Sequence, residues 1–201
     1  KHINMKHLKS TLLTLVALLC STVASAYSFN VDGIFYNITN SYDDLTVEVT
    51  FESDINGIYN SYSGDVVIPA TVTYDNKVYK VTKIGSCAFR NSNTLTSVVI
   101  SESVTSIEIL AFLGCNSLTS IVLPEGVTRI GDSAFGGCSS LTEVDLSSFD
   151  TSKVTNVRAM FSGCAFLGEL DLSSFDMSNV QDRKHMFMDC PTGFKWQHLL
   201  H

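Results

Sequence analysis

The stretch Leu118-Thr-Ser-Ile-Val-Leu-Pro repeats, with small changes, the stretch Leu95-Thr-Ser-Val-Val-Ile-Ser that lies 23 residues before it. Two further pairs keep the same spacing: Val104-Thr-Ser-Ile107 with Val127-Thr-Arg-Ile130, and Ala111-Phe112-Leu-Gly-Cys115 with Ala134-Phe135-Gly-Gly-Cys138. A fixed period of this length is the signature of a solenoid, in which each repeat is one supersecondary unit that buries its apolar face only against its neighbours. The sequence therefore predicts an array of stacked coils.

The repeat extends in both directions from this stretch. Downstream the spacing lengthens to 26 residues, because Leu141-Thr-Glu-Val-Asp-Leu-Ser-Ser-Phe149 returns as Leu167-Gly-Glu-Leu-Asp-Leu-Ser-Ser-Phe175. Upstream the first coil carries an insertion over residues 71–81, in which β-branched and aromatic residues alternate with polar ones around Asp75-Asn76. This alternation around a two-residue turn predicts a β-hairpin. Five coils are expected over residues 63–190.

Each coil is expected to contain a short strand and a short helical turn. In the pattern Leu-x-x-Val-x-Leu, apolar side chains at the first, fourth and sixth positions would point inward from a strand, and the later Val, Ile and Ala-Phe positions would fill the same core. The residue before each cysteine slot tolerates a positive φ, which is typical of the end of a helical turn. These residues are Asn91, Gly114, Gly137, Gly163 and Asp189.

The segment Leu118–Phe135 resembles the BspA-like class of bacterial leucine-rich repeats, and Phe149–Val157 with Met160-Phe161 resembles the 26-residue variant of that repeat. The likeness covers about residues 63–190. It implies a leucine-rich-repeat solenoid of the α/β type, with short parallel strands and short helical turns. It also implies secretion or display on the surface of a host-associated bacterium, in some cases as an adhesin for host matrix proteins or other cells, and no catalytic residues.

Residues 1–26 are predicted to be a secretory signal peptide. Met5-Lys-His-Leu-Lys-Ser supplies a basic start, residues 11–19 an apolar core, and Ala24-Ser-Ala26 a small-residue cleavage site. The apolar core is too short to span a membrane, so we expect cleavage after this site and no membrane insertion afterwards. Lipidation at Cys20 is the alternative, although the leucine before it is larger than the residue usual at that position.

Export would change the charge balance of the chain. Residues 1–26 contain three of the 13 basic residues and none of the 20 acidic ones, so the exported chain carries a net charge of −10. Nucleic acids and anionic membrane surfaces bind clustered Lys and Arg, and this balance therefore argues against both as partners. No later stretch of the sequence is apolar over the length that crosses a bilayer.

The two ends of the array differ from its coils. Residues 27–62 alternate at period two in Ser28–Thr39 and in Leu45–Phe51, around a turn at Asn40–Asp44, and are expected to form a small β-rich N-terminal cap. Residues 191–201 lose the register. Either this tail folds over the last coil, or the chain is a fragment or a frame-shifted end of a longer array, and we favour the second. The tail residues that would cover the last coil are Phe194, Trp196 and Leu199.

The cysteines and histidines do not form a catalytic or metal-binding pattern. One repeated slot holds a cysteine in four coils and Ser92 in the first, so we expect buried structural thiols in preference to disulfides between adjacent coils or a metal site. All five histidines lie in the leader or near the C-terminal end, and none stands in a recognisable order with a nucleophile and an acidic partner. No catalytic residue, cofactor or metal is expected. The cysteines of the slot are Cys115, Cys138, Cys164 and Cys190.

The outward positions of the strands are the candidate ligand face. In register, the fifth position of the strand passes from apolar to acidic along the stack, and the third position supplies further carboxylates. The candidate residues are Val67, Val99, Val122, Glu143, Asp145, Glu169 and Asp171. Three other interpretations remain for the acidic part: a solvated face that keeps the sheet soluble, a site for a cation or basic peptide, and a glycosidase carboxylate pair.

Taken together, the repeat and the leader predict a secreted or cell-surface, non-enzymatic binding module. It would be adhesin-like and would contact a host protein or glycan. The alternative is a structural spacer, a piece of a longer repeat array that displays another domain. The expected partner is a protein or glycan ligand at a cell surface.

Overall fold

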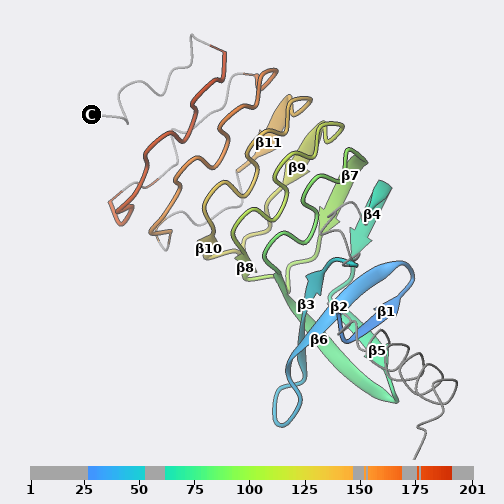
Figure 1. Cartoon of the computed structure of the whole chain (residues 1–201). Coiled ribbons are helices and arrows are strands. Elements are labelled where there is room, and N and C mark those ends of the chain that lie inside the picture. Colours follow the sequence, from blue (N-terminus) through green and yellow to red (C-terminus); the bar gives the residue numbers. More distant parts are fainter. Residues whose placement is uncertain are drawn as a thin grey trace, which may run out of the picture.

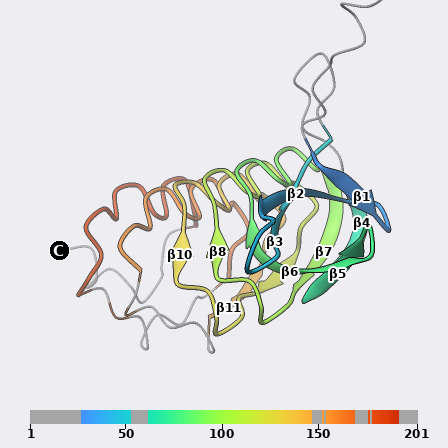
Figure 2. The same ribbon diagram turned by 90° about the horizontal axis from the view of Figure 1, so that it is seen from below.

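The computed structural model describes residues 27–52, 62–146, 152, 154–168, 176 and 178–191. Successive coils lie side by side along one axis, in the order of the chain (Figure 1). Seen from below, the coils form walls that run the length of the stack (Figure 2), and the buried apolar side chains form one continuous core between these walls. The chain therefore folds as the predicted solenoid.

The first wall is a parallel sheet built from the Leu-x-x-Val-x-Leu pattern. Its strands follow the order β11-β9-β7-β4, with Ser97 paired to Ser120 and Ser120 paired to Glu143. The apolar positions point inward as predicted, and Leu118 and Ile121 are buried. The strands are β4 (Ser63–Ile68), β7 (Thr94–Ile100), β9 (Ser120–Val122) and β11 (Glu143–Asp145).

The second wall is a parallel sheet that continues into the N-terminal strands. Strand β8 pairs with β6 on one side and β10 on the other, and β3 pairs with β6 in parallel. Strand β5 runs antiparallel to β6, with Asp75 and Asn76 at positive φ in the turn between them, which confirms the predicted hairpin. The strands are β3 (Thr46–Thr50), β5 (Thr71–Tyr74), β6 (Lys77–Ile84), β8 (Ser106–Ile107) and β10 (Arg129–Ile130).

The N-terminal residues form three strands where the sequence predicts two. Strands β1 (Phe29–Val31) and β2 (Ile34–Asn40) are antiparallel, and β3 follows β2 after the predicted turn. The prediction of a single strand over residues 28–39 is wrong, because Asp32 and Gly33 adopt positive φ and form a tight turn that divides it. Asp-Gly is a strong two-residue hairpin signal. The role of these strands as a cap and the boundary at residue 62 stay predictions.

The third wall consists of linked tight turns in place of the expected helical turn, and the described residues contain no α-helix. In one central coil, the N–H groups of Leu113 and Cys115 donate back over three residues. The alternate N–H groups, those of Leu110, Phe112 and Gly114, donate to carbonyl groups of the next coil. A helix would bond every N–H within its own coil. The tight turns form in place of a helix because they allow half of these N–H groups to donate to carbonyl groups of the neighbouring coil.

Residues at positive φ recur twice in each coil of this wall. The predicted set adopts φ between 57° and 76°, at Asn91, Gly114, Gly137, Gly163 and Asp189. A second set lies four residues earlier, at Cys87, Leu110, Ser133, Ala159 and His185. The sequence does not reveal this second set, since such side chains disfavour left-handed backbone by about 1 kcal/mol or more. The hydrogen bonds between coils offset that cost.

One phenylalanine from each coil lies in a single buried row. Neighbouring rings stack at centroid distances of 4.8, 5.3, 5.7 and 5.8 Å. Tyr62 continues the row, with its ring 4.4 Å from the first phenylalanine and its hydroxyl donating to the carbonyl of Thr50 in β3. The shared core predicted from the repeat is thereby confirmed. The row consists of Phe89, Phe112, Phe135, Phe161 and Phe187.

The repeated cysteine slot lies beside this row. The buried thiols of Cys115, Cys138 and Cys164 are free, and each donates to the carbonyl of the phenylalanine one coil earlier, at 3.0, 3.2 and 3.3 Å. A hydrogen bond with Cys115, together with burial, raises the pKa of Cys138, and burial raises the pKa of Cys164. The structural-thiol interpretation therefore holds for these three cysteines of the slot.

In the folded protein, we expect iodoacetamide at about pH 8 to alkylate Cys87 well before Cys115, Cys138 and Cys164. Cys87 is partly exposed, whereas the other three thiols are buried. Alkylation also needs the thiolate, which the raised pKa values of Cys138 and Cys164 disfavour. Peptide mapping with and without guanidinium measures the order of modification. Equal rates in the native protein would contradict the burial of the slot.

Some predictions fall outside the described residues. They concern the leader with Cys20, the acidic positions Glu169 and Asp171, and the tail from residue 192 onward. Within the part of the chain that the structure describes, no helix has the length and apolar character needed to cross a bilayer.

Candidate binding surfaces

Three valines form an exposed row across the first wall. Val67 on β4, Val99 on β7 and Val122 on β9 are 64%, 58% and 57% exposed, and Val67 pairs in register with Val99. They alternate with buried residues, because successive side chains of a strand point to opposite faces of the sheet. The structure therefore places the three predicted valines together on the surface, and their role in binding stays a prediction.

Two carboxylates continue this face beyond the valines. Asp145 of β11 pairs in register with Val122, and Glu143 is exposed two residues earlier on the same strand. The further carboxylates expected from the repeat lie outside the described residues. Within the described ranges, no three Asp, Glu, His or Cys side chains are grouped so as to hold a metal ion. The face therefore passes from apolar to acidic along the stack.

A third exposed carboxylate lies at the opposite end of the valine row. Asp65 of β4 accepts hydrogen bonds from Ser97 Oγ at 2.6 Å and from Thr96 Oγ1 at 2.8 Å. These two bonds, that from Ser97 first, lower the pKa of Asp65 because they stabilise the ionised form. The three valines and these carboxylates are called the valine face below, and this face is negatively charged at both ends.

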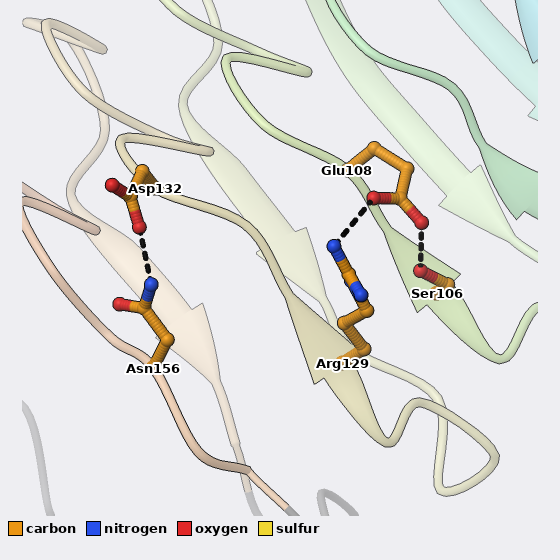
Figure 3. Close-up of polar contacts among 5 residues, drawn as sticks. All are labelled: Ser106, Glu108, Arg129, Asp132 and Asn156. Atoms are coloured by element: carbon orange, nitrogen blue, oxygen red, sulfur yellow. Dashed lines mark hydrogen bonds and ion pairs between the residues drawn. The ribbon is translucent and has the colours of Figure 1, made fainter. Parts of the chain in front are cut away.

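The second wall carries a polar groove that the repeat pattern does not predict. This open groove has a volume of about 700 Å³ and is lined by residues from four successive coils. Glu108 accepts a hydrogen bond from Ser106 Oγ at 2.6 Å and pairs with Arg129, whose Nη2 lies 3.4 Å from Glu108 Oε2 (Figure 3). Beside this pair, Asn156 Nδ2 donates to Asp132 Oδ1. Two polar pairs therefore lie next to each other along the stack.

A break in the repeat marks the position of this groove. The slot that holds Glu108 holds Gly85 one coil earlier and Gly131 one coil later. Glycine suits the slot because adjacent backbones approach closely there: a Cβ on Gly131 would lie 2.4 Å from Ile109 N. A glutamate among glycines was the signal in the sequence that could have located the groove. Its partners come from other coils, so the pairing itself needed the structure.

The groups in the groove suit binding better than nucleophilic catalysis. Its lining contains no histidine or cysteine, and His185, the one histidine in the described ranges, lies exposed on the last described coil. A nucleophilic serine or threonine needs an adjacent base to activate it. The groove instead offers carboxylate, guanidinium, amide and hydroxyl groups, which form hydrogen bonds with a polar ligand.

A family model described as the BspA type leucine rich repeat region matches residues 70–192. It matches in six copies, where the repeat predicts five coils. This range includes two of the three exposed valines and most of both walls. A search of curated proteins found no match to the sequence.

Three solved structures of bacterial proteins are similar to this chain. A leucine rich cell surface protein from Faecalibacterium prausnitzii is 28% identical, with a TM-score of 0.55, over 81% of this chain and 46% of that one. A leucine-rich repeat protein from Bacteroides capillosus is 31% identical, with a TM-score of 0.47, over 66% of this chain and 83% of that one. The pneumococcal vaccine antigen PcpA is 18% identical, with a TM-score of 0.51, over 81% of this chain and 47% of that one. At this identity the likeness shows only that the fold is similar. This chain spans about half the length of the first and third proteins.

Proposed function

Because this chain belongs to the family of BspA-type leucine-rich repeat proteins, we propose that it is a secreted or surface-displayed binding module of a bacterium. It is non-enzymatic and adhesin-like, and it contacts a host protein or glycan. The observation that carries the proposal is the exposed row of Val67, Val99 and Val122 on the first wall. The similarity to a cell surface protein of Faecalibacterium prausnitzii supports the location.

The valine row favours a protein as the partner of this face. Single exposed apolar residues are normal on protein surfaces, whereas a contiguous apolar patch marks an interaction site. The three valines stand on adjacent strands, about 4.8 Å apart, so they form one continuous strip. Burial of each valine side chain against an apolar partner would contribute about 1.5 kcal/mol or more.

The carboxylates at the two ends of the row define the charge of that partner. Asp65 lies at one end, and Glu143 with Asp145 lies at the other. An apolar surface flanked by Lys or Arg residues would therefore match the valine face. Charges at the rim of an interface affect the rate of association and the choice of partner more than the affinity. The net negative charge expected for the exported chain would also attract a positively charged partner.

Replacement of two valines by threonine tests this proposal. We expect Val99→Thr with Val122→Thr to reduce binding to cultured epithelial cells and to immobilised extracellular-matrix proteins by roughly tenfold, since apolar contact area is lost. Threonine keeps the β-branched shape, so the sheet should be unaffected. Val78→Thr is the matched control, because Val78 is 58% exposed and lies on β6, which belongs to the other sheet. Equal binding by the parent protein and the double variant would contradict the proposal.

A structural spacer is the second candidate function. It is supported by the fact that this chain spans about half the length of the similar cell surface protein from Faecalibacterium prausnitzii. A spacer would need no ligand of its own, so the valine face would have no partner. In the same experiment, binding of the parent protein no stronger than that of an unrelated acidic protein would favour the spacer.

A further inference from the structure

The polar groove of the second wall carries a separate proposal. We propose that this groove binds a neutral, linear oligosaccharide. The groove lies along β8 and β10, whereas the valine row lies on β4, β7 and β9 of the other sheet. The two sites therefore use different walls of the solenoid (Figure 2). The groove could bind a sugar whether or not the valine face binds a protein.

The groove runs along the axis of the stack. Its lining includes Ser86 from the first coil, Glu108 from the second, Arg129 and Asp132 from the third, and Asn156 from the fourth. Coils of a parallel stack repeat about every 4.8 Å, a spacing close to the length of one pyranose unit in an extended β-linked glycan. A linear oligosaccharide along this axis would therefore place about one sugar ring on each coil.

The polar side chains of the groove match the hydrogen-bonding groups of a sugar. Neighbouring hydroxyls on a pyranose both donate and accept, so a planar side chain with two polar atoms can bond two of them at once. The carboxylates of Glu108 and Asp132 accept, the guanidinium of Arg129 donates, and the amide of Asn156 does both. The Arg129 side chain is 70% exposed, and its contact with Glu108 is a single long one. Most of its five N–H donors therefore remain for a ligand.

Contacts within the protein hold these groups in place before a ligand arrives. The Glu108 side chain is 19% exposed and is held by Ser106 as well as by Arg129. The backbone N–H of Arg158 donates to Asn156 Oδ1 at 2.8 Å, while Asn156 Nδ2 bonds Asp132. Figure 3 shows the two pairs side by side on neighbouring coils. A site that is already ordered loses less conformational entropy on binding.

The remaining features of the groove select for a sugar that is uncharged. Ile109 lines the groove and is 44% exposed, so it offers an apolar surface to the C–H face of a pyranose ring. Two carboxylates and one guanidinium leave the lining with a net negative charge. A sialylated or sulfated glycan would be repelled, since a like charge in the site opposes binding. Neutral sugars avoid this cost.

Isothermal titration calorimetry on the purified chain tests the proposal. Cellotriose, chitotriose and an N-acetyllactosamine oligomer represent plant, microbial-wall and host sources, and 3′-sialyllactose is the anionic probe. We expect at least one neutral oligosaccharide to bind and sialyllactose not to bind. Arg129→Ala and Ile109→Ser should each weaken that binding, roughly tenfold for the arginine because hydrogen bonds to a charged group are lost. Lys77→Ala is the control, since this exposed basic residue at the start of β6 does not line the groove.

Thermal unfolding of each variant separates loss of the site from loss of the fold. An exposed ion pair contributes little to stability, so Arg129→Ala should melt close to the parent protein. Asp132→Asn keeps the shape of the side chain and is a further groove variant, expected to weaken sugar binding.

Three outcomes would overturn the proposal: no neutral oligosaccharide binds at millimolar concentration, sialyllactose binds equally well, or the groove variants bind as the parent does. The Val99→Thr and Val122→Thr variant should keep its sugar binding. A failure of the protein-binding proposal is therefore distinguishable from a failure of this one.

Discussion

Phe112→Ala is expected to lower the free energy of unfolding by about 3–5 kcal/mol, the range for removal of a buried aromatic side chain. Phe112 is fully buried, and its ring lies between those of Phe89 at 4.8 Å and Phe135 at 5.3 Å. Alanine would leave a cavity in the middle of the row, lined by side chains that belong to three coils. Each coil is stabilised mainly by its neighbours, so the loss of packing would destabilise the coils on both sides of the cavity.

Phe187→Ala provides the matched comparison, and we expect it to cost clearly less. Phe187 occupies the same slot in the last described coil, where it is 8% exposed. Urea unfolding followed by circular dichroism gives both free energies, with the slope of the transition as a check on cooperativity. Phe135→Ala should resemble Phe112→Ala. Equal losses at Phe112 and Phe187 would show that the last coil is packed as tightly as the centre.

Gly131→Ala is expected to destabilise the protein by about 3 kcal/mol or more, although it adds a single methyl group. A Cβ at Gly131 would lie 2.4 Å from Ile109 N, 2.7 Å from Ile109 Cα and 2.7 Å from Glu108 C. All three atoms belong to the backbone of the preceding coil, so no side-chain rotation can relieve the contact. The two coils would have to separate, and the hydrogen bond from Gly131 N to Ile107 O at 2.8 Å would be lost or weakened.

Gly137→Ala separates steric contact from backbone strain. Gly137 has a φ of +66°, and the nearest atoms to an added Cβ are 3.7 Å away, which is an ordinary contact. Its cost should be about 1–2 kcal/mol, the strain of a left-handed alanine. Urea unfolding of both variants measures the difference. A Gly137→Ala variant as unstable as Gly131→Ala would mean that conformation, and not the approach of the coils, sets the requirement for glycine.

Positions that recur in every coil are the ones whose place in the fold follows from the sequence. The phenylalanine row, the cysteine slot and the inward positions of the first wall all follow from the period, and the described residues show all three. The valine row could be predicted for the same reason. Once parallel strands stack in register, equal positions in successive coils must lie side by side.

The third wall shows where this reasoning fails. Residues such as Leu110 and Ala159 have positive φ, although neither residue type signals it. Their conformation depends on hydrogen bonds to the next coil, such as that from Leu110 N to Asp132 O at 3.0 Å. Local propensity predicts a helical turn there, because it takes account only of the hydrogen bonds within one coil. The bonds between coils exist only after the stack has formed.

The sequence by itself determined the solenoid, its shared apolar core and its exposed row of valines, because the period places like side chains at like positions and no coil can bury its apolar face alone. Only the tertiary structure decided the path of the third wall and the existence of the polar groove. Both depend on contacts between coils: backbone hydrogen bonds in the first case, and in the second the meeting of Glu108 with Arg129 and of Asp132 with Asn156. Such pairs break the repeat, and so its pattern does not encode them.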